Sequence, residues 1–139
     1  MNIDLNTKAK NTWCPGCTNF MILTAFKNAL SELITEGKIK KDNIVVGAGI
    51  GCHGKIADYV GTNSIISLHG RVVPTMTGVK LGNPNLTAIA FSGDGDSYAE
   101  GIEHLVHAAK RNSDIKLFVH NNQVFGLTTG QVTPTSNKG

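Results

Sequence analysis

Apolar residues along the chain follow two spacings, one helical and one typical of buried strands. Across residues 19–36, Leu23, Phe26 and Leu30 recur at helical intervals, and Gly37 follows where a helix would end. Four short apolar runs are typical of strands that are covered on both faces. These runs are residues 43–48, 64–68, 86–91 and 115–119.

Helices and strands alternate along the sequence, which predicts an α/β fold. Further helices are expected at residues 74–81, with Pro74 in the first turn, and at residues 97–110. This order indicates a mainly parallel sheet with helices on both faces. Ligands of such sheets bind beyond the carboxyl ends of the strands. Three loops are therefore expected to converge on one site: GAGIGCHGK, SGDGDS and HNNQVFG.

Composition narrows the class of protein. The chain has 139 residues, of which 40% are hydrophobic and 17% charged, so residues 1–139 are expected to form one domain. The net charge of +3 is mild and its Lys and Arg are scattered, which argues against a nucleic-acid partner. No apolar stretch is long enough to cross a membrane, and the first residues do not resemble a signal peptide. We expect a cytoplasmic protein whose polar last segment, TGQVTPTSNKG, leaves the domain incomplete at its C-terminus.

The loop SGDGDS places two carboxylates among glycines. Asp94 can offer an oxygen to Mg²⁺, and the flanking glycines let a diphosphate approach the backbone. Asn122, one helix and one strand later, can add an amide oxygen. A GDG or an Asn-Asn pair alone is more often an ordinary turn, but the combination is far more selective. One of the two acids can cap the helix expected from Ser97, which leaves the other unexplained.

Three cysteines occur in two loops. Cys14 and Cys17 form CPGC before the first helix, and Cys52 lies in GIGC. Disulfides are not expected in a cytoplasmic protein, and three cysteines cannot all pair within one chain. The spacing suits zinc or an iron–sulfur cluster, although either normally needs a fourth ligand. A redox-active pair and inert cysteines stay as alternatives.

Other polar residues have weaker signals. Lys55, close to Cys52, is either a reader of a substrate carboxylate or a solvated surface charge, and Arg71 and His69 in LHGR are candidates for substrate or diphosphate contacts. His104 and His107 share a helix with two glutamates, a pattern that more often marks a solvated face than a metal site.

These motifs resemble a known family. The stretch from GDG to NN is similar to the thiamine diphosphate motif, and Asp94, Asn122 and the backbone carbonyl of Val124 would then hold Mg²⁺. WCPGC, GIGCHGK, LHGRVVPTMTGVKLGNP and GLTTGQVTPTS resemble the β subunit of 2-oxoacid:ferredoxin oxidoreductases, particularly the 2-oxoglutarate type, over residues 13–136. His53 and Phe125 depart from the residues usual in that family.

The resemblance implies a thiamine diphosphate-binding fold. Asp96 would cap the following helix or shape the diphosphate loop. The residues expected to contact the cofactor lie in the three loops and in LHGR: Gly51, Cys52, His53, His69, Gly93, Asp94, Gly95, Asp96, Asn122, Val124, Gly126 and Leu127.

The resemblance also implies a [4Fe-4S] cluster on Cys14, Cys17 and Cys52, which should then lie within a few ångströms of one another. Its fourth cysteine would come from a later part of the subunit that is absent from this chain. The implied activity is oxidative decarboxylation of a 2-oxoacid to an acyl-CoA, with electrons passed to ferredoxin. An α subunit would complete the active site, and no residue of this chain is assigned as a general acid or base. The alternatives are a thiamine diphosphate-dependent carboligase or decarboxylase, which would not explain the cysteines, and a non-catalytic metal-binding module.

Overall fold

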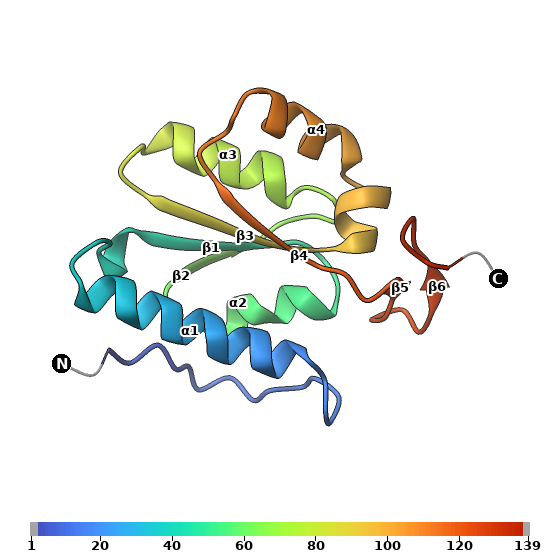
Figure 1. Cartoon of the computed structure of the whole chain (residues 1–139), viewed down its shortest axis with the longest axis horizontal. Coiled ribbons are helices and arrows are strands. Elements are labelled where there is room, and N and C mark those ends of the chain that lie inside the picture. The colour runs from blue at the N-terminus through green and yellow to red at the C-terminus, as the bar shows by residue number, and fades with distance from the viewer. Residues whose placement is uncertain (1–2, 138–139) are drawn as a thin grey trace.

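A parallel four-stranded sheet forms the centre of the computed structural model, which describes residues 3–137 (Figure 1). The strand order is β2-β1-β3-β4. The strands are β1 (Ile44–Ala48), β2 (Asn63–Ile66), β3 (Thr87–Gly93) and β4 (Lys116–His120). The helices are α1 (Asn19–Thr35), α2 (Ile56–Tyr59), α3 (Val72–Gly82) and α4 (Ile102–Lys110), with short 3₁₀ turns at Lys41–Asn43 and Cys52–Lys55.

Each face of the sheet has its own hydrophobic core, because side chains alternate along the strands. On one face, Ile44 and Phe91 of the sheet pack in a cluster with Leu30 of α1. On the other face, Ala90 packs in a cluster with Met76 of α3. Figure 1 shows α1 and α2 below the sheet and α3 and α4 above it. The predicted α/β fold with helices on both faces is confirmed.

The strand order reverses direction beside β1. This strand pairs with β2 on one side and with β3 on the other, and both pairings are parallel. The chain therefore leaves β1 toward one edge and later returns to its opposite side. At such a switch point the loops after the two central strands diverge, which is where sheets of this kind bind ligands.

A small hairpin lies beyond the carboxyl ends of the strands (Figure 1). It consists of β5 (Val124–Phe125) and β6 (Gln131–Val132), which pair antiparallel. After β6 the chain turns back toward the sheet, and the side chains of Thr133 and Thr135 reach Asp94 at the end of β3.

The helix expected at residues 97–110 is divided, so that prediction was wrong in its first turn. Gly95–Ala99 forms a π-helical turn, in which the N–H of Glu100 donates to the carbonyl of Gly95, and α4 begins only at Ile102. The physical reason is that Asp96 turns inward and is buried beside Ser92 of β3. Single π-turns of this kind are frequent at functional sites.

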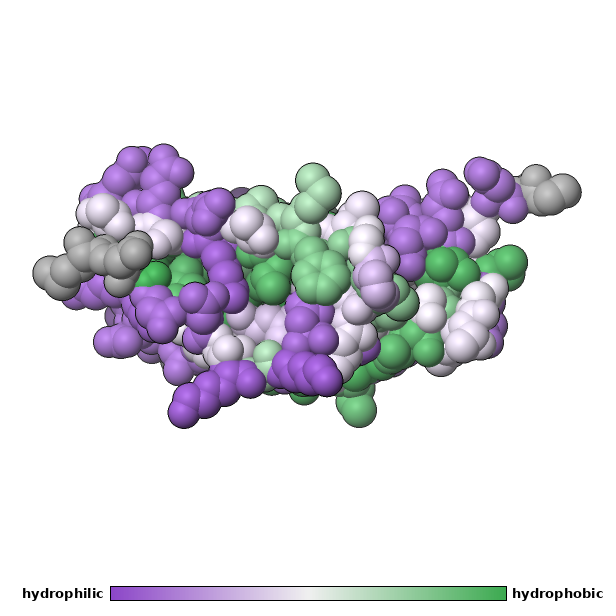
Figure 2. All heavy atoms as spheres, turned by 90° about the horizontal axis from the view of Figure 1, so that it is seen from below, coloured by the Kyte–Doolittle hydropathy of each residue, from purple (hydrophilic) through white to green (hydrophobic). Residues whose placement is uncertain are grey.

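The surface seen from below mixes polar and hydrophobic residues (Figure 2). Hydrophobic side chains exposed on the described residues include Met21 of α1 and Val132 of β6, 73% and 78% exposed. Among residues 3–137, none of the helices combines the length and the apolar character that a bilayer crossing requires. The cytoplasmic location stays a prediction.

Candidate functional site

A cavity of about 360 Å³ opens at the carboxyl ends of β1, β3 and β4. Its volume lies within the range of small-molecule sites. Its walls come from the loops after these strands, from the start of α1 and from the β5–β6 hairpin. All twelve residues that the motifs single out for the cofactor line it: Gly51, Cys52, His53, His69, Gly93, Asp94, Gly95, Asp96, Asn122, Val124, Gly126 and Leu127. The three loops therefore converge on one cavity, as the sequence predicts.

Asp94 lies at the base of this cavity, where its side chain is 1% exposed. Its Oδ2 accepts hydrogen bonds from the hydroxyls of Thr133 at 2.5 Å and Thr135 at 2.7 Å, and its Oδ1 lies 3.4 Å from the backbone nitrogen of Asn122. Burial alone would raise the pKa of Asp94, but these hydrogen bonds more than offset it and leave the pKa below its usual value. The carboxylate is therefore held ionised in a buried position.

Two further polar groups face the free side of Asp94. The side-chain amide of Asn122 lies 3.0 Å from Asp94 Oδ1 and 2.8 Å from the carbonyl oxygen of Val124. Without a cation, the amide nitrogen satisfies both oxygens by donating to them. With the amide oxygen turned inward, Asp94, Asn122 and Val124 offer three neighbouring oxygens, which are the kind of ligand that Mg²⁺ prefers. The donor set fits a hard divalent cation.

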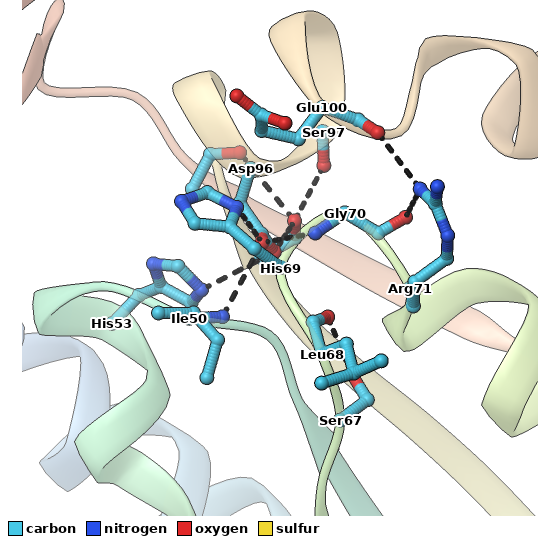
Figure 3. Close-up of polar contacts among 12 residues, drawn as sticks. Ile50, His53, Ser67, Leu68, His69, Gly70, Arg71, Asp96, Ser97 and Glu100 are labelled. Carbon is cyan, nitrogen blue, oxygen red and sulfur yellow. Dashed lines mark hydrogen bonds and ion pairs between the residues drawn. The ribbon is translucent and has the colours of Figure 1, made fainter.

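Asp96 joins three loops (Figure 3). It is 2% exposed, and its Oδ1 accepts hydrogen bonds from the backbone N–H groups of Gly70 at 2.7 Å and Ile50 at 3.3 Å. Its Oδ2 accepts a hydrogen bond from the Ser92 hydroxyl at 2.5 Å. A Cβ on Gly49 would collide with this carboxylate. The loops after β1, β2 and β3 are thus tied to one buried side chain.

The expectation that Asp96 caps a helix is wrong. The residue before α4 is Gly101, and neither the π-turn nor α4 has a side-chain cap. Asp96 cannot serve as a cap because its oxygens are already used between the loops. It does shape the loops that surround the cavity.

Histidines surround the Asp96 carboxylate. His53 Nε2 lies 3.5 Å from Oδ2 and His69 Nδ1 lies 2.8 Å from Oδ1. Burial would raise the pKa of Asp96, but the contact with His53 and the other hydrogen bonds lower it to about 2. Nearby, burial lowers the pKa of His120 to about 4, with a smaller contribution from the charge of His53. His120 Nδ1 lies 2.8 Å from the side-chain oxygen of Asn19 in α1.

The three cysteines line the same cavity as free thiols. Cys14 is exposed, whereas Cys17 and Cys52 are half-buried. Within residues 3–137, however, no three side chains of His, Cys, Asp or Glu are grouped closely enough to hold a metal ion. The expected convergence of the thiolates within a few ångströms is therefore not confirmed. The loops meet, but the thiolates do not form a closed ligand set.

Trp13 connects the two cysteine loops. Its indole Nε1 donates to the carbonyl oxygen of Cys52 at 2.6 Å, and its ring makes edge contacts with Phe20 and Tyr59. Trp13 is 7% exposed, so this hydrogen bond is largely shielded from water.

Lys55 and Arg71 lie outside the cavity lining. Lys55 Nζ is 3.4 Å from the carbonyl oxygen of Thr12. Arg71 Nη1 donates to the carbonyl oxygen of Glu100 at 2.9 Å and lies 3.8 Å from Glu103 Oε1. Both cations have partners within the chain, so their roles in substrate binding stay predictions that this arrangement does not favour. His104 pairs with Glu103 at 3.2 Å.

Several residues of the site were not predicted from the sequence. Thr133 and Thr135 contact Asp94 from a segment that reads as a polar tail, and Asn19 and His120 meet only because α1 lies beside β4. Thr-Pro-Thr-Ser after a strand was a usable hint, because hydroxyl side chains often bond locally in turns.

Comparison with known proteins agrees with this geometry. Residues 49–139 match the family model described as "Thiamine pyrophosphate enzyme, C-terminal TPP binding domain". The matched part includes the loops after β1, β3 and β4 and therefore most of the cavity lining.

Individual relatives and a solved structure are similar over almost the whole chain. The 2-oxoacid:ferredoxin oxidoreductase subunit beta of a Sulfolobus species is 46% identical over 131 residues, which are 93% of this chain and 42% of that protein. The 2-oxoglutarate synthase subunit KorB of Archaeoglobus fulgidus is 39% identical over 91% of this chain and 46% of its own length.

A 2-oxoglutarate:ferredoxin oxidoreductase from Magnetococcus marinus, solved with 2-oxoglutarate, coenzyme A and succinyl-CoA bound, superposes with a TM-score of 0.90 at 33% identity. The match covers 96% of this chain and 44% of that one. The chain thus spans less than half the length of the relatives it matches. By the match over residues 49–139, this chain belongs to the family of the thiamine pyrophosphate enzyme C-terminal TPP binding domain.

Proposed function

We propose that this chain binds thiamine diphosphate together with Mg²⁺ as part of the β subunit of a 2-oxoacid:ferredoxin oxidoreductase, with 2-oxoglutarate as the favoured substrate. The observation that carries the proposal is the oxygen set of Asp94, Asn122 and Val124 at the base of the cavity. The names of the similar proteins support the choice of reaction.

In this proposal the side chains of Asp94 and Asn122 and the carbonyl of Val124 hold Mg²⁺, which neutralises the diphosphate. Gly51, with φ of 139°, adopts a backbone conformation that other residues rarely reach, and so keeps the loop after β1 close to the cavity. When bound, thiamine diphosphate supplies the nucleophilic carbon and the electron sink for loss of carbon dioxide from a 2-oxoacid. The chain itself orients the cofactor and, through Asp96, fixes the surrounding loops.

We assign Cys14, Cys17 and Cys52 to a [4Fe-4S] cluster within the same proposal. This assignment is supported by the three free thiols that line one cavity, because cysteine thiolates are the ligands of iron–sulfur clusters. Their arrangement in the described residues does not fit a metal centre as it stands. In this proposal, cluster assembly would draw the thiolates together and add a fourth ligand to them.

The remaining assignments concern partners. An α subunit, ferredoxin, the 2-oxoacid and coenzyme A would complete the reaction. Leu127 at the cavity rim is 48% exposed, which is consistent with a surface that another chain covers. Neither nucleic acid nor membrane is proposed as a partner.

Reduction of a viologen dye by the protein purified in its native assembly tests this function. We expect reduction that requires thiamine diphosphate and Mg²⁺ and is faster with 2-oxoglutarate than with pyruvate. Asp94→Asn should lower the rate at least tenfold, whereas Asp114→Asn, a change of the same chemistry on the exposed surface, should leave it unchanged. A rate of dye reduction by Asp94→Asn equal to that of the wild type would contradict the proposal.

A further inference from the structure

The two oxygens of the Asp94 carboxylate have different surroundings. Oδ2 accepts two hydroxyl hydrogen bonds, from Thr133 at 2.5 Å and Thr135 at 2.7 Å. Oδ1 faces the side-chain amide of Asn122 at 3.0 Å and its backbone nitrogen at 3.4 Å, and within residues 3–137 it accepts no hydrogen bond from a hydroxyl. Only one oxygen of the carboxylate is therefore left for the space between Asp94, Asn122 and Val124.

The two hydroxyls are placed by a tight turn of the chain itself. The N–H of Thr133 donates to Ser136 Oγ at 2.8 Å, and the N–H of Ser136 donates to the carbonyl of Thr133 at 3.0 Å. The Ser136 hydroxyl in turn donates to the carbonyl of Gln123 at 2.5 Å. Thr133 is 7% exposed. This turn anchors both threonines against Asp94 without any help from a ligand.

The negative charge of Asp94 determines which acceptor the threonine hydroxyls donate to. Thr135 Oγ1 also lies 2.9 Å from Asn121 Oδ1, but each hydroxyl has a single proton. A hydrogen bond to an ionised carboxylate is stronger than one to a neutral amide. Both threonines therefore donate to Asp94 and fix the rotation of its carboxylate.

We propose that Thr133 and Thr135 determine metal specificity, because they restrict Asp94 to coordination through one oxygen and so favour Mg²⁺ over Ca²⁺. The inference rests on the proposed function. Mg²⁺ demands a near-ideal octahedron, whereas Ca²⁺ accepts 6–8 ligands and often takes both oxygens of a carboxylate.

The test measures thiamine diphosphate binding by calorimetry in Mg²⁺ and in Ca²⁺, with the native assembly freed of metal by chelation. The variant Thr133→Val/Thr135→Val removes both hydroxyls and keeps the side-chain shape. We expect the ratio of affinity in Mg²⁺ to affinity in Ca²⁺ to fall at least tenfold, because Oδ2 is released for a larger ion. The pair Thr133→Ser/Thr135→Ser retains the hydroxyls and should retain the ratio. Thr75→Val, in α3 and remote from the site, controls for the loss of a hydroxyl as such.

The outcomes separate this inference from the proposed function. An equal loss of affinity in both metals, with an unchanged ratio, would show that the threonines only support the fold and would overturn the inference alone. Binding by the wild type that is independent of any divalent cation would overturn the metal site and with it the inference. If the double variant fails to fold, Thr135→Val, whose side chain is only half-buried, should still lower the ratio about threefold, half of the tenfold effect on a logarithmic scale. An unchanged ratio in that folded single variant would also overturn the inference.

Discussion

The cavity has two sides that differ in how far they are prepared for a ligand. The oxygen side consists of Asp94, Asn122 and Val124, and the thiol side consists of Cys14, Cys17 and Cys52. On the oxygen side, the Asn122 amide already lies within 3.0 Å of both Asp94 Oδ1 and the carbonyl oxygen of Val124. On the thiol side, the residues share a cavity but do not form a metal-binding group in the described chain.

The contrast follows from what surrounds each set. Asp94 is almost fully buried, and two hydroxyls from a separate turn hold it. Cys14 is exposed, and the loop that contains it is tied to Cys52 mainly through Trp13. Groups fixed by buried hydrogen bonds are in position before a ligand arrives. Groups on exposed loops depend on what binds them.

The largest effect on stability is expected from Asp96→Ala, which removes the carboxylate that ties together the loops around the oxygen side. This change leaves the N–H of Gly70 and the hydroxyl of Ser92 without their acceptor and removes the partner of His69. We expect a loss of about 3–5 kcal/mol in the free energy of unfolding, measured by urea denaturation without cofactor. Ser97→Ala, which only removes a donor to Ser92 at the edge of the network, should lose about 1 kcal/mol. A loss below 1 kcal/mol for Asp96→Ala would show that the loops are held by other contacts.

Acid should lower the free energy of unfolding in two steps, through His120 and Asp96, which line the same cavity. The pKa of His120 is lowered from 6.5 to about 4, so the unfolded chain binds a proton that the folded chain does not, and stability falls as pH drops from 6.5 to about 4. The pKa of Asp96 is lowered from 3.8 to about 2, so its contribution is present above 3.8 and is lost as pH falls further.

We expect protonation of His120 to lower the free energy of unfolding by about 2 kcal/mol, a value reduced to allow for the part of the imidazole ring that water reaches. His120→Gln keeps a polar group near Asn19 and should remove this step while leaving the second step intact. Urea unfolding at a series of pH values measures both. A profile that is the same for wild type and variant between pH 6.5 and 4 would argue against a buried neutral His120.

A smaller effect is expected where the two cysteine loops meet. Trp13→Phe keeps an aromatic ring against Phe20 and Tyr59 but removes the hydrogen bond to Cys52. The expected loss is about 1 kcal/mol, measured by circular dichroism in urea. A loss above 3 kcal/mol would mean that the thiol side is held as firmly as the oxygen side, and the contrast between them would disappear.

The smallest effect on stability is expected for Cys14→Ser. Its side chain is exposed, so the free energy of unfolding of the metal-free protein should change by less than about 0.5 kcal/mol. Iron bound per protein after reconstitution should nevertheless fall, together with visible absorption. Undiminished iron and absorption in Cys14→Ser would remove Cys14 from the cluster.

The sequence was sufficient to predict the sheet and the loops that form the site. Buried strands and GDG followed by Asn122 are local patterns, and the topology of parallel strands brings their carboxyl ends together. The role of Asp96 was not predictable in this way, because its partners Gly70 and Ser92 come from other loops and strands. The same holds for Thr133, whose contact with Asp94 exists only after the chain turns back from β6.

The central claim is that Asp94 binds a metal which in turn binds thiamine diphosphate. Calorimetric titration of the native assembly with thiamine diphosphate, in Mg²⁺ and after removal of divalent metal by chelation, tests it most directly. The account predicts binding that requires Mg²⁺ and that is weakened at least tenfold, or about 1.4 kcal/mol, by Asp94→Asn. It also predicts unchanged binding for Asp114→Asn at the exposed surface. Equal affinity of the wild type and Asp94→Asn in Mg²⁺ would contradict it.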